Sequence, residues 1–187
     1  NLTLGTSSSN TTNDWNLATF RFGPRSAPGV LTLRAAGNIV LNNAISDGFN
    51  GGSNLWLSPL LANNALLPDN AESWSYGFTA GADTASAGFR ETLPLSSLAD
   101  TAGFLQLGKN MGNALAIGGN NALTSSLIGN NYNVIRTGSG DIDISAARSV
   151  QLLNPFASIY TAGTQVANPT AIFAPNDFIV PVLTGNL

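Results

Sequence analysis

The stretch GVLTLRAAGNIVLNNAISDG, residues 29–48, recurs further along the chain as GDIDISAARSVQLLNPFASIYTAG, residues 140–163. In both copies a pair of apolar residues spaced by two is followed, eight positions later, by a second such pair. The pairs are Leu31/Leu33 and Ile39/Leu41 in the first copy, and Ile142/Ile144 and Val150/Leu152 in the second. Alternation of apolar and polar residues over such short stretches predicts short strands with one buried face.

A tight corner of small residues separates the two pairs in each copy. The corner is Arg34-Ala35-Ala36-Gly37 in the first copy and Ser145-Ala146-Ala147-Arg148 in the second. A strand this short cannot bury its apolar face alone, so repeated strands joined by tight corners are typical of stacked, solenoid-like chains. The repeat therefore predicts an all-β fold, a β-solenoid with irregular loops.

Other segments fit this organisation less regularly. Residues 73–83, SWSYGFTAGAD, alternate with Trp74, Tyr76 and Phe78 on one face, which favours a place in the core over an exposed sugar-binding surface. A third, looser copy of the repeat is expected at residues 104–118, where Leu105/Leu107 leads to Leu115/Ile117. Helical spacing of apolar residues predicts one short helix at residues 93–103, and residues 54–68 suit either a short helix or an irregular loop.

The chain divides into three expected parts. Residues 1–28 hold leading strands, at Leu2/Leu4, Trp15–Leu17 and Phe20–Phe22, around a polar loop; residues 29–163 form the solenoid module; residues 164–187 form an extended tail. The tail carries three prolines, which belong at the edges of sheets or outside them. Because the chain opens directly on strand-like residues without a signal peptide, we expect it to be a piece of a longer polypeptide.

Low charge and missing residue types narrow the classes of function. Only 9% of the 187 residues are charged and the net charge is −3 with a single lysine, Lys109, so no basic face is expected for nucleic acid or an anionic membrane. The longest apolar run, residues 178–183, is too short to span a bilayer. A chain without cysteine or histidine has no disulfides, no zinc–thiolate site and no histidine base.

The acidic residues suggest little catalytic chemistry. Asp141 and Asp143 lie two apart on an expected strand and would share a face opposite Ile142 and Ile144, where they could hold calcium or cleave a glycosidic bond. Solvent-facing residues that keep the outer face soluble are the favoured interpretation, because no third carboxylate is adjacent. Asp47 and Asp83 are expected in turns, and the two glutamates, Glu72 and Glu91, have no histidine partner.

The remaining polar motifs also favour structural roles. Arg34 and Arg136 could contact an anion or a sugar, but arginines at strand ends are usually solvated. Residues 138–140, Gly-Ser-Gly, lack the lysine of a phosphate loop and predict a turn. Asparagine pairs suit tight corners and amide ladders between stacked coils better than a glycan-binding surface. These pairs are Asn42-Asn43, Asn63-Asn64, Asn120-Asn121 and Asn130-Asn131.

Four of these motifs, in this order, resemble an interior module of the large exoproteins of the filamentous haemagglutinin type, which Gram-negative bacteria export by two-partner secretion. They are LTLRAAGNIVLNNAISDGF (31–49), SWSYGFTAGAD (73–83), VIRTGSGDIDISAARSVQL (134–152) and SIYTAG (158–163). The resemblance implies a right-handed parallel β-helix, passage across the outer membrane through a partner pore, and a place on the cell surface or in released filaments. Members of that family also carry an N-terminal secretion domain, which we do not expect within these 187 residues.

These observations lead to a structural or adhesive role, with no enzyme activity and with no catalytic, cofactor-binding or metal-ligating residue assigned. The expected partners are other copies of the chain or flanking segments of a longer one, an outer-membrane secretion partner, and host or cell-surface glycans. A polysaccharide-acting β-helix enzyme is the alternative, with Asp141, Asp143 and Arg136 or Arg148 as its cluster. A calcium-stiffened adhesin is a third.

Overall fold

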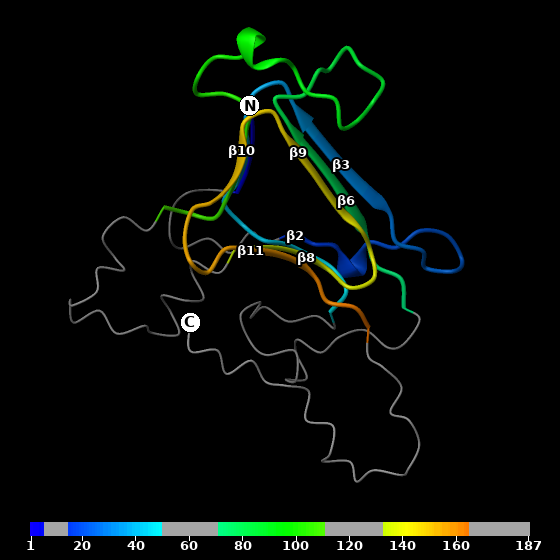
Figure 1. The fold of residues 1–187 in the computed structure, drawn as a ribbon. Coiled ribbons are helices and arrows are strands. Elements are labelled where there is room, and N and C mark those ends of the chain that lie inside the picture. Colours follow the sequence, from blue (N-terminus) through cyan, green and yellow to red (C-terminus); the bar gives the residue numbers. More distant parts are fainter. Residues whose placement is uncertain (6–14, 50–70, 111–132, 165–187) are drawn as a thin grey trace, which may run out of the picture.

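A computed structural model describes residues 1–5, 15–49, 71–110 and 133–164 (Figure 1). The expected helix or loop at residues 54–68, the second half of the looser copy, three of the four asparagine pairs and the proline-containing tail all lie outside these ranges.

The described residues form three parallel sheets, so the all-β prediction is confirmed. The first sheet contains β1 (Leu2–Leu4), β4 (Ile39–Leu41), β7 (Phe104–Leu107) and β10 (Ser149–Leu152). The second sheet contains β2 (Trp15–Asn16), β5 (Ile45–Ser46), β8 (Val134–Thr137) and β11 (Ser158–Thr161). The third sheet contains β3 (Val30–Ala35), β6 (Ser75–Ala80) and β9 (Ile142–Ala146). Two single turns of 3₁₀-helix, η1 (Leu17–Thr19) and η3 (Leu95–Ser97), complete the described elements.

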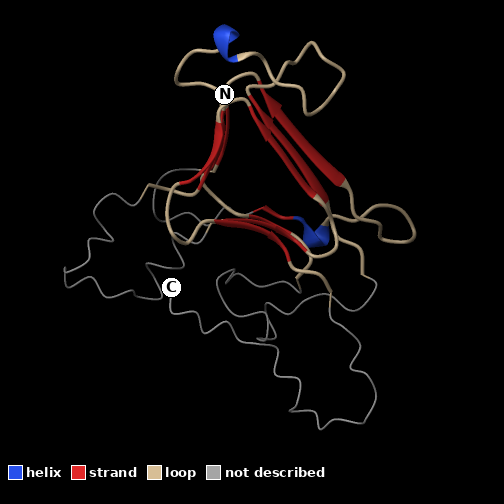
Figure 2. Ribbon diagram, viewed as in Figure 1, coloured by secondary structure: helices blue, strands red, loops and turns tan. Residues whose placement is uncertain are grey.

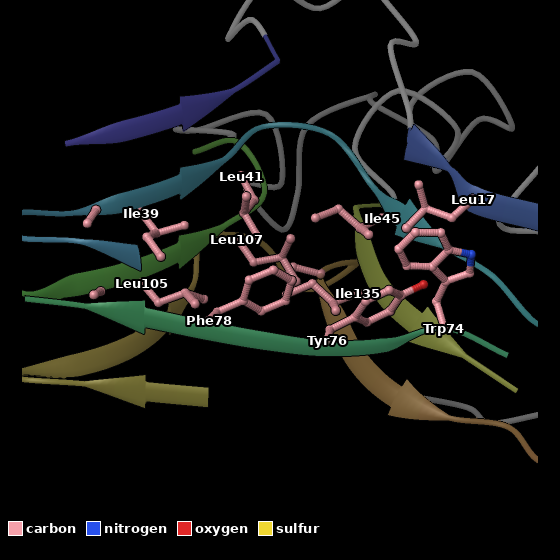
Figure 3. Close-up of a cluster of buried hydrophobic side chains, with 13 residues drawn as sticks. Leu17, Ile39, Leu41, Ile45, Trp74, Tyr76, Phe78, Leu105, Leu107 and Ile135 are labelled. Atoms are coloured by element: carbon pink, nitrogen blue, oxygen red, sulfur yellow. The ribbon is translucent and has the colours of Figure 1, made fainter. Parts of the chain in front are cut away.

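Consecutive strands belong to different sheets, and the chain returns to the same sheet after visiting the other two. From β3 in the third sheet it passes to β4 in the first and β5 in the second, before β6 pairs beside β3. Figure 2 shows the three sheets as the sides of a triangle. The apolar side chains of the core cluster come from all three sheets. Figure 3 shows Ile39, Leu41, Phe78 and Leu107 meeting in this interior, where each is fully buried.

A third copy of the repeat, not apparent in the sequence, lies between the two clear copies and pairs with both. Tyr76 pairs with Leu31 on one side and with Ile142 on the other, and Leu105 lies between Ile39 and Val150. The middle copy therefore starts in β6 and continues in β7. The prediction that Leu105/Leu107 opens a looser copy is wrong, because residues 81–103 separate the two strands and hide their relationship.

Several predicted boundaries also change. Arg34 and Ala35 continue β3, and Ser145 and Ala146 continue β9, so both corners begin two residues later than predicted. Residues 93–103 contain one exposed 3₁₀ turn rather than an amphipathic helix. The expected strand at 20–22 is absent from the described sheets, because Phe22 makes only an isolated antiparallel bridge to Ala27.

Glycines at the corner after the second sheet allow successive corners to stack closely. Gly48 has φ +84°, and a Cβ placed on it would lie 2.0 Å from the backbone nitrogen of Gly138. The left-handed conformation favours glycine, and the approach of the two backbones leaves no room for a side chain. The corner therefore depends on glycine for both reasons.

Gly48→Ala should lower the free energy of unfolding by well over about 2 kcal/mol, because left-handed strain adds to a collision with backbone atoms. Gly23→Ala is the matched control: Gly23 has φ +67° but no atom within 4 Å of its would-be Cβ. The control should cost only the conformational strain, about 1–2 kcal/mol. Urea unfolding of both variants measures the difference, and equal losses would contradict the close stacking of the corners.

Candidate functional site

The most distinctive group of polar residues lies where the second and third sheets meet. It is built from segments far apart in the sequence: the chain before β3, the end of β5 with the residues that follow it, the start of β6, β8 and β11. Its principal side chains are Arg21, Asp47, Phe49, Tyr76, Arg136 and Tyr160. We call this group the buried polar corner.

Asp47 is the centre of one half of this corner. Its carboxylate is fully buried, and both of its oxygens accept hydrogen bonds from Nη2 of Arg21, at 2.9 and 3.1 Å. The backbone N–H of Trp74 donates to the same carboxylate at 2.7 Å. Arg21 in turn donates from Nη1 to the carbonyl oxygens of Leu17 and Phe20. Asp47 thus ties the chain before β3 to the start of β6.

Arg136 is the centre of the other half. Ser46, Arg136 and Tyr160 are aligned by the strand register, one residue beyond the inward-facing Ile45, Ile135 and Ile159. Alternation along the strands therefore places this polar column on the face of the second sheet opposite the core.

Other side chains cover the Arg136 guanidinium, which leaves the residue 2% exposed. Its Nε donates to the Ser46 hydroxyl at 2.7 Å, its Nη1 contacts the Tyr160 hydroxyl at 3.3 Å, and it stacks over the Phe49 ring at 3.6 Å from the centroid. A cation held against an aromatic face in a desolvated place is a stabilising contact. The expectation that Arg136 is solvated is therefore wrong, because Phe49 folds back over the sheet.

Tyr76 joins the two halves from inside the core. Its hydroxyl donates to the carbonyl oxygen of Arg136 at 3.1 Å, and its ring stacks with that of Phe78. Burial raises the pKa of the Tyr76 phenol well above its usual range, and the Asp47 carboxylate raises the pKa further. The prediction that Trp74, Tyr76 and Phe78 belong to the core is confirmed, since all three are buried (Figure 3).

Asparagine amides fill the corner between the first and second sheets. Asn42 and Asn43 are buried, and the Asn42 side-chain amide donates to the carbonyl of Gly5. The Asn133 amide donates to the carbonyl of Asn42, and the Asn154 amide donates to the carbonyl of Lys109. These bonds connect one corner to the next along the stack. The structural interpretation of the Asn42-Asn43 pair is therefore confirmed.

The residues predicted as a catalytic cluster do not come together. Asp143 lies on the outer face of the third sheet, 41% exposed, and pairs with Arg90. Arg136 is buried on the second sheet, as described above. Arg148 lies at a corner, where it donates to the carbonyls of Ala99 and Ala102 and pairs with Asp100.

Other predicted polar residues take part in turns and loops. Asp83 accepts a hydrogen bond from the backbone N–H of Ala85, as expected of a turn residue, and the bends at residues 138–140 agree with the predicted turn. Arg34 is only partly exposed and donates to the carbonyls of Asp83 and Ser86, so its expected solvation is wrong. Asp141 is exposed, in agreement with a solvent-facing role.

The buried polar corner is suited to holding the fold together. Its charges are satisfied by neighbouring side chains and backbone groups, which leaves the Asp47 carboxylate committed to Arg21 and Trp74. Among the described residues, no group of three or more acidic, histidine or cysteine side chains could hold a metal ion. Sequence reasoning missed the role of Asp47, because nothing in Ser-Asp-Gly distinguishes a buried carboxylate from an ordinary turn.

In comparisons with known proteins, no family model, curated protein or solved structure matches this chain. In the ranges that the structure describes, no helix is long and apolar enough to cross a membrane.

Asp47→Asn should lower the free energy of unfolding by about 3 kcal/mol or more, because it leaves the mostly buried Arg21 guanidinium without its counter-charge. Asp143→Asn is the matched control, since it removes an aspartate that also pairs with arginine but lies in solvent. The control should change stability little. Chemical unfolding monitored by tryptophan fluorescence checks both variants, and a small loss for Asp47→Asn would show that the corner does not stabilise the fold.

Stability should fall at alkaline pH because of Tyr76. The fold holds the pKa of this phenol above its usual value of 10.0, so its stabilising contribution is complete below pH 10.0 and is lost as the pH rises further. Tyrosinate absorbance should show Tyr76 ionising only as the chain unfolds, and Tyr76→Phe should flatten the alkaline dependence of the free energy of unfolding. Reversible ionisation of every tyrosine near pH 10.0 in the folded chain would contradict the burial of Tyr76.

Proposed function

We propose that the three sheets are the faces of a right-handed parallel β-helix, and that the chain is a structural or adhesive module of an exported bacterial surface protein of the filamentous haemagglutinin type. One observation carries the proposal: inward residues of successive strands stay in register, as in the column Leu2–Ile39–Leu105–Val150. Such columns extend a fold along one axis by adding similar layers, which suits an elongated scaffold.

The stabilising contacts support a role outside the cell. Backbone pairing, the apolar interior and the buried polar corner hold the described strands together without a disulfide, because the chain has no cysteine. A regular fold of this kind is compatible with export in an unfolded form through an outer-membrane partner, followed by folding at the cell surface. The proposed location and secretion partner rest on the resemblance of the four sequence motifs.

The last layer among the described strands, which contains β10 and β11, has features that favour contact with further layers. Val150 and Leu152 continue the inward column of the first sheet but are 44% and 51% exposed, whereas their neighbours Leu105 and Leu107 are fully buried. Strand edges and apolar side chains at the end of a stack favour pairing with another strand. Flanking segments of a longer polypeptide, or another copy of the chain, are the partners proposed for this end.

An adhesive role predicts specific attachment to cells without turnover of polysaccharide. Fluorescent beads coated with the folded chain should bind epithelial cells more than albumin-coated beads do, and the free chain should compete. A Phe78→Asp variant, which places a charge at a fully buried position, should not compete. Incubation with a panel of acidic and neutral polysaccharides should release no fragments.

Either of two results would overturn this role. One is catalytic cleavage of a polysaccharide by the purified chain. The other is bead binding that neither exceeds the albumin control nor responds to competition by the folded chain.

A further inference from the structure

The segment between η1 and β3 inverts the usual placement of charged and apolar side chains. Arg21 points inward to the buried Asp47, whereas its neighbours Phe20 and Phe22 are each 58% exposed. Val30, which opens β3, is 71% exposed, and Arg25 is also exposed. We call Phe20, Phe22, Arg25 and Val30 the aromatic corner; Figure 2 shows its loop projecting from the end of the third sheet.

The backbone of this loop is fixed by contacts from three sides. Phe22 and Ala27 exchange two backbone hydrogen bonds, of 2.8 and 2.9 Å. The indole N–H of Trp74 donates to the Phe20 carbonyl at 2.9 Å, and the Trp74 ring lies behind that of Phe22, with 5.7 Å between ring centroids. The loop backbone and the Phe22 ring are therefore held in place before any partner binds, which lowers the entropy lost on binding.

Phe22 contacts Trp74 but stays 58% exposed, and Phe20 and Val30 are at least as exposed. Aromatic residues gathered on a rigid, exposed segment together with an arginine have the composition of a protein-binding surface. The aromatic corner is thus a candidate for contact with another molecule.

We propose that the aromatic corner binds an apolar, acidic polypeptide segment of a partner protein. Phe20, Phe22 and Val30 have no side-chain hydrogen-bonding groups, so a sugar bound to them would lose water from its hydroxyl groups without gaining hydrogen bonds. Apolar side chains of a polypeptide can pack against them without this loss. Arg25 takes part in no ion pair of the described chain, and residues 15–30 contain no acidic residue. A carboxylate on the partner complements its guanidinium.

The number of basic residues distinguishes this partner from a membrane. Arg25 is the one basic residue of the aromatic corner, and one guanidinium can pair with one carboxylate, whereas binding to an anionic bilayer depends on a cluster of lysines and arginines. The inference rests on the proposed adhesive role, and it names the class of molecule to which the module attaches.

Selection of random peptides displayed on phage tests the inference with the whole folded chain as bait. The expected outcome is enrichment of peptides in which apolar residues accompany aspartate or glutamate. A synthetic peptide with the enriched sequence should bind at least about tenfold more weakly to Phe22→Ser and to Arg25→Gln. Leu95→Ser and Arg90→Gln are matched controls, because they change an equally exposed apolar residue and an exposed arginine elsewhere, and they should bind normally.

Thermal melting of each variant shows whether it is folded. Arg25→Gln changes an exposed side chain and removes no ion pair of the described residues, so it remains informative if Phe22→Ser unfolds. Failure to enrich such peptides, equal binding by all variants, or selective binding to sialylated glycans or anionic vesicles instead would overturn the inference. The same variants in the bead assay separate the two proposals. If the native chain and the corner variants bind cells equally, the corner is wrong while the adhesive role stands; if the native chain does not bind, the adhesive role fails.

Discussion

Parallel pairing in register is the constraint on which the rest of the structure depends. Side chains alternate between the two faces of a strand, so a shift of one residue would move the apolar column of that strand from the interior to the outer face. Leu31, Tyr76 and Ile142 share one inward row of the third sheet, and the polar column of Ser46, Arg136 and Tyr160 keeps to the outside of the second. The burial of both columns depends on the same register.

The buried polar corner fixes the arrangement of segments that the apolar columns alone would not determine. Apolar rows tolerate exchange of one aliphatic residue for another, whereas a carboxylate with Arg21 on one side and the Trp74 N–H on the other accepts only one arrangement. Asp47 therefore selects how the chain before β3 meets the start of β6. In the proposed role this matters, because the aromatic corner is presented by the segment that Arg21 anchors.

Period-two alternation predicted the strands of the two clear copies of the repeat, but neither the absence of a strand at residues 20–22 nor the contacts that depend on distant segments. The strands at Leu31/Leu33 and Ile39/Leu41 lie where alternation placed them, since each needs only its own pattern and a nearby turn. The middle copy escaped recognition because an insertion separates β6 from β7. The burial of Asp47 and Arg136 could not be predicted, because their partners are Arg21, Ser46, Phe49 and Tyr160 on segments that only the fold brings together.

The insertion at residues 81–103 shows that a long loop between two strands leaves the pairing of those strands unchanged. Residues 81–93 of the insertion form a loop that is closed by the hydrogen bond from the Leu93 N–H to the Gly81 carbonyl and by the bridge between Ala82 and Thr92. After residue 103, β7 resumes pairing with β4. A chain built this way can change the size of one corner during evolution while the rise of each layer stays constant. The same corner is the natural place to graft a foreign peptide, which the parallel sheets would display without altering their inward columns.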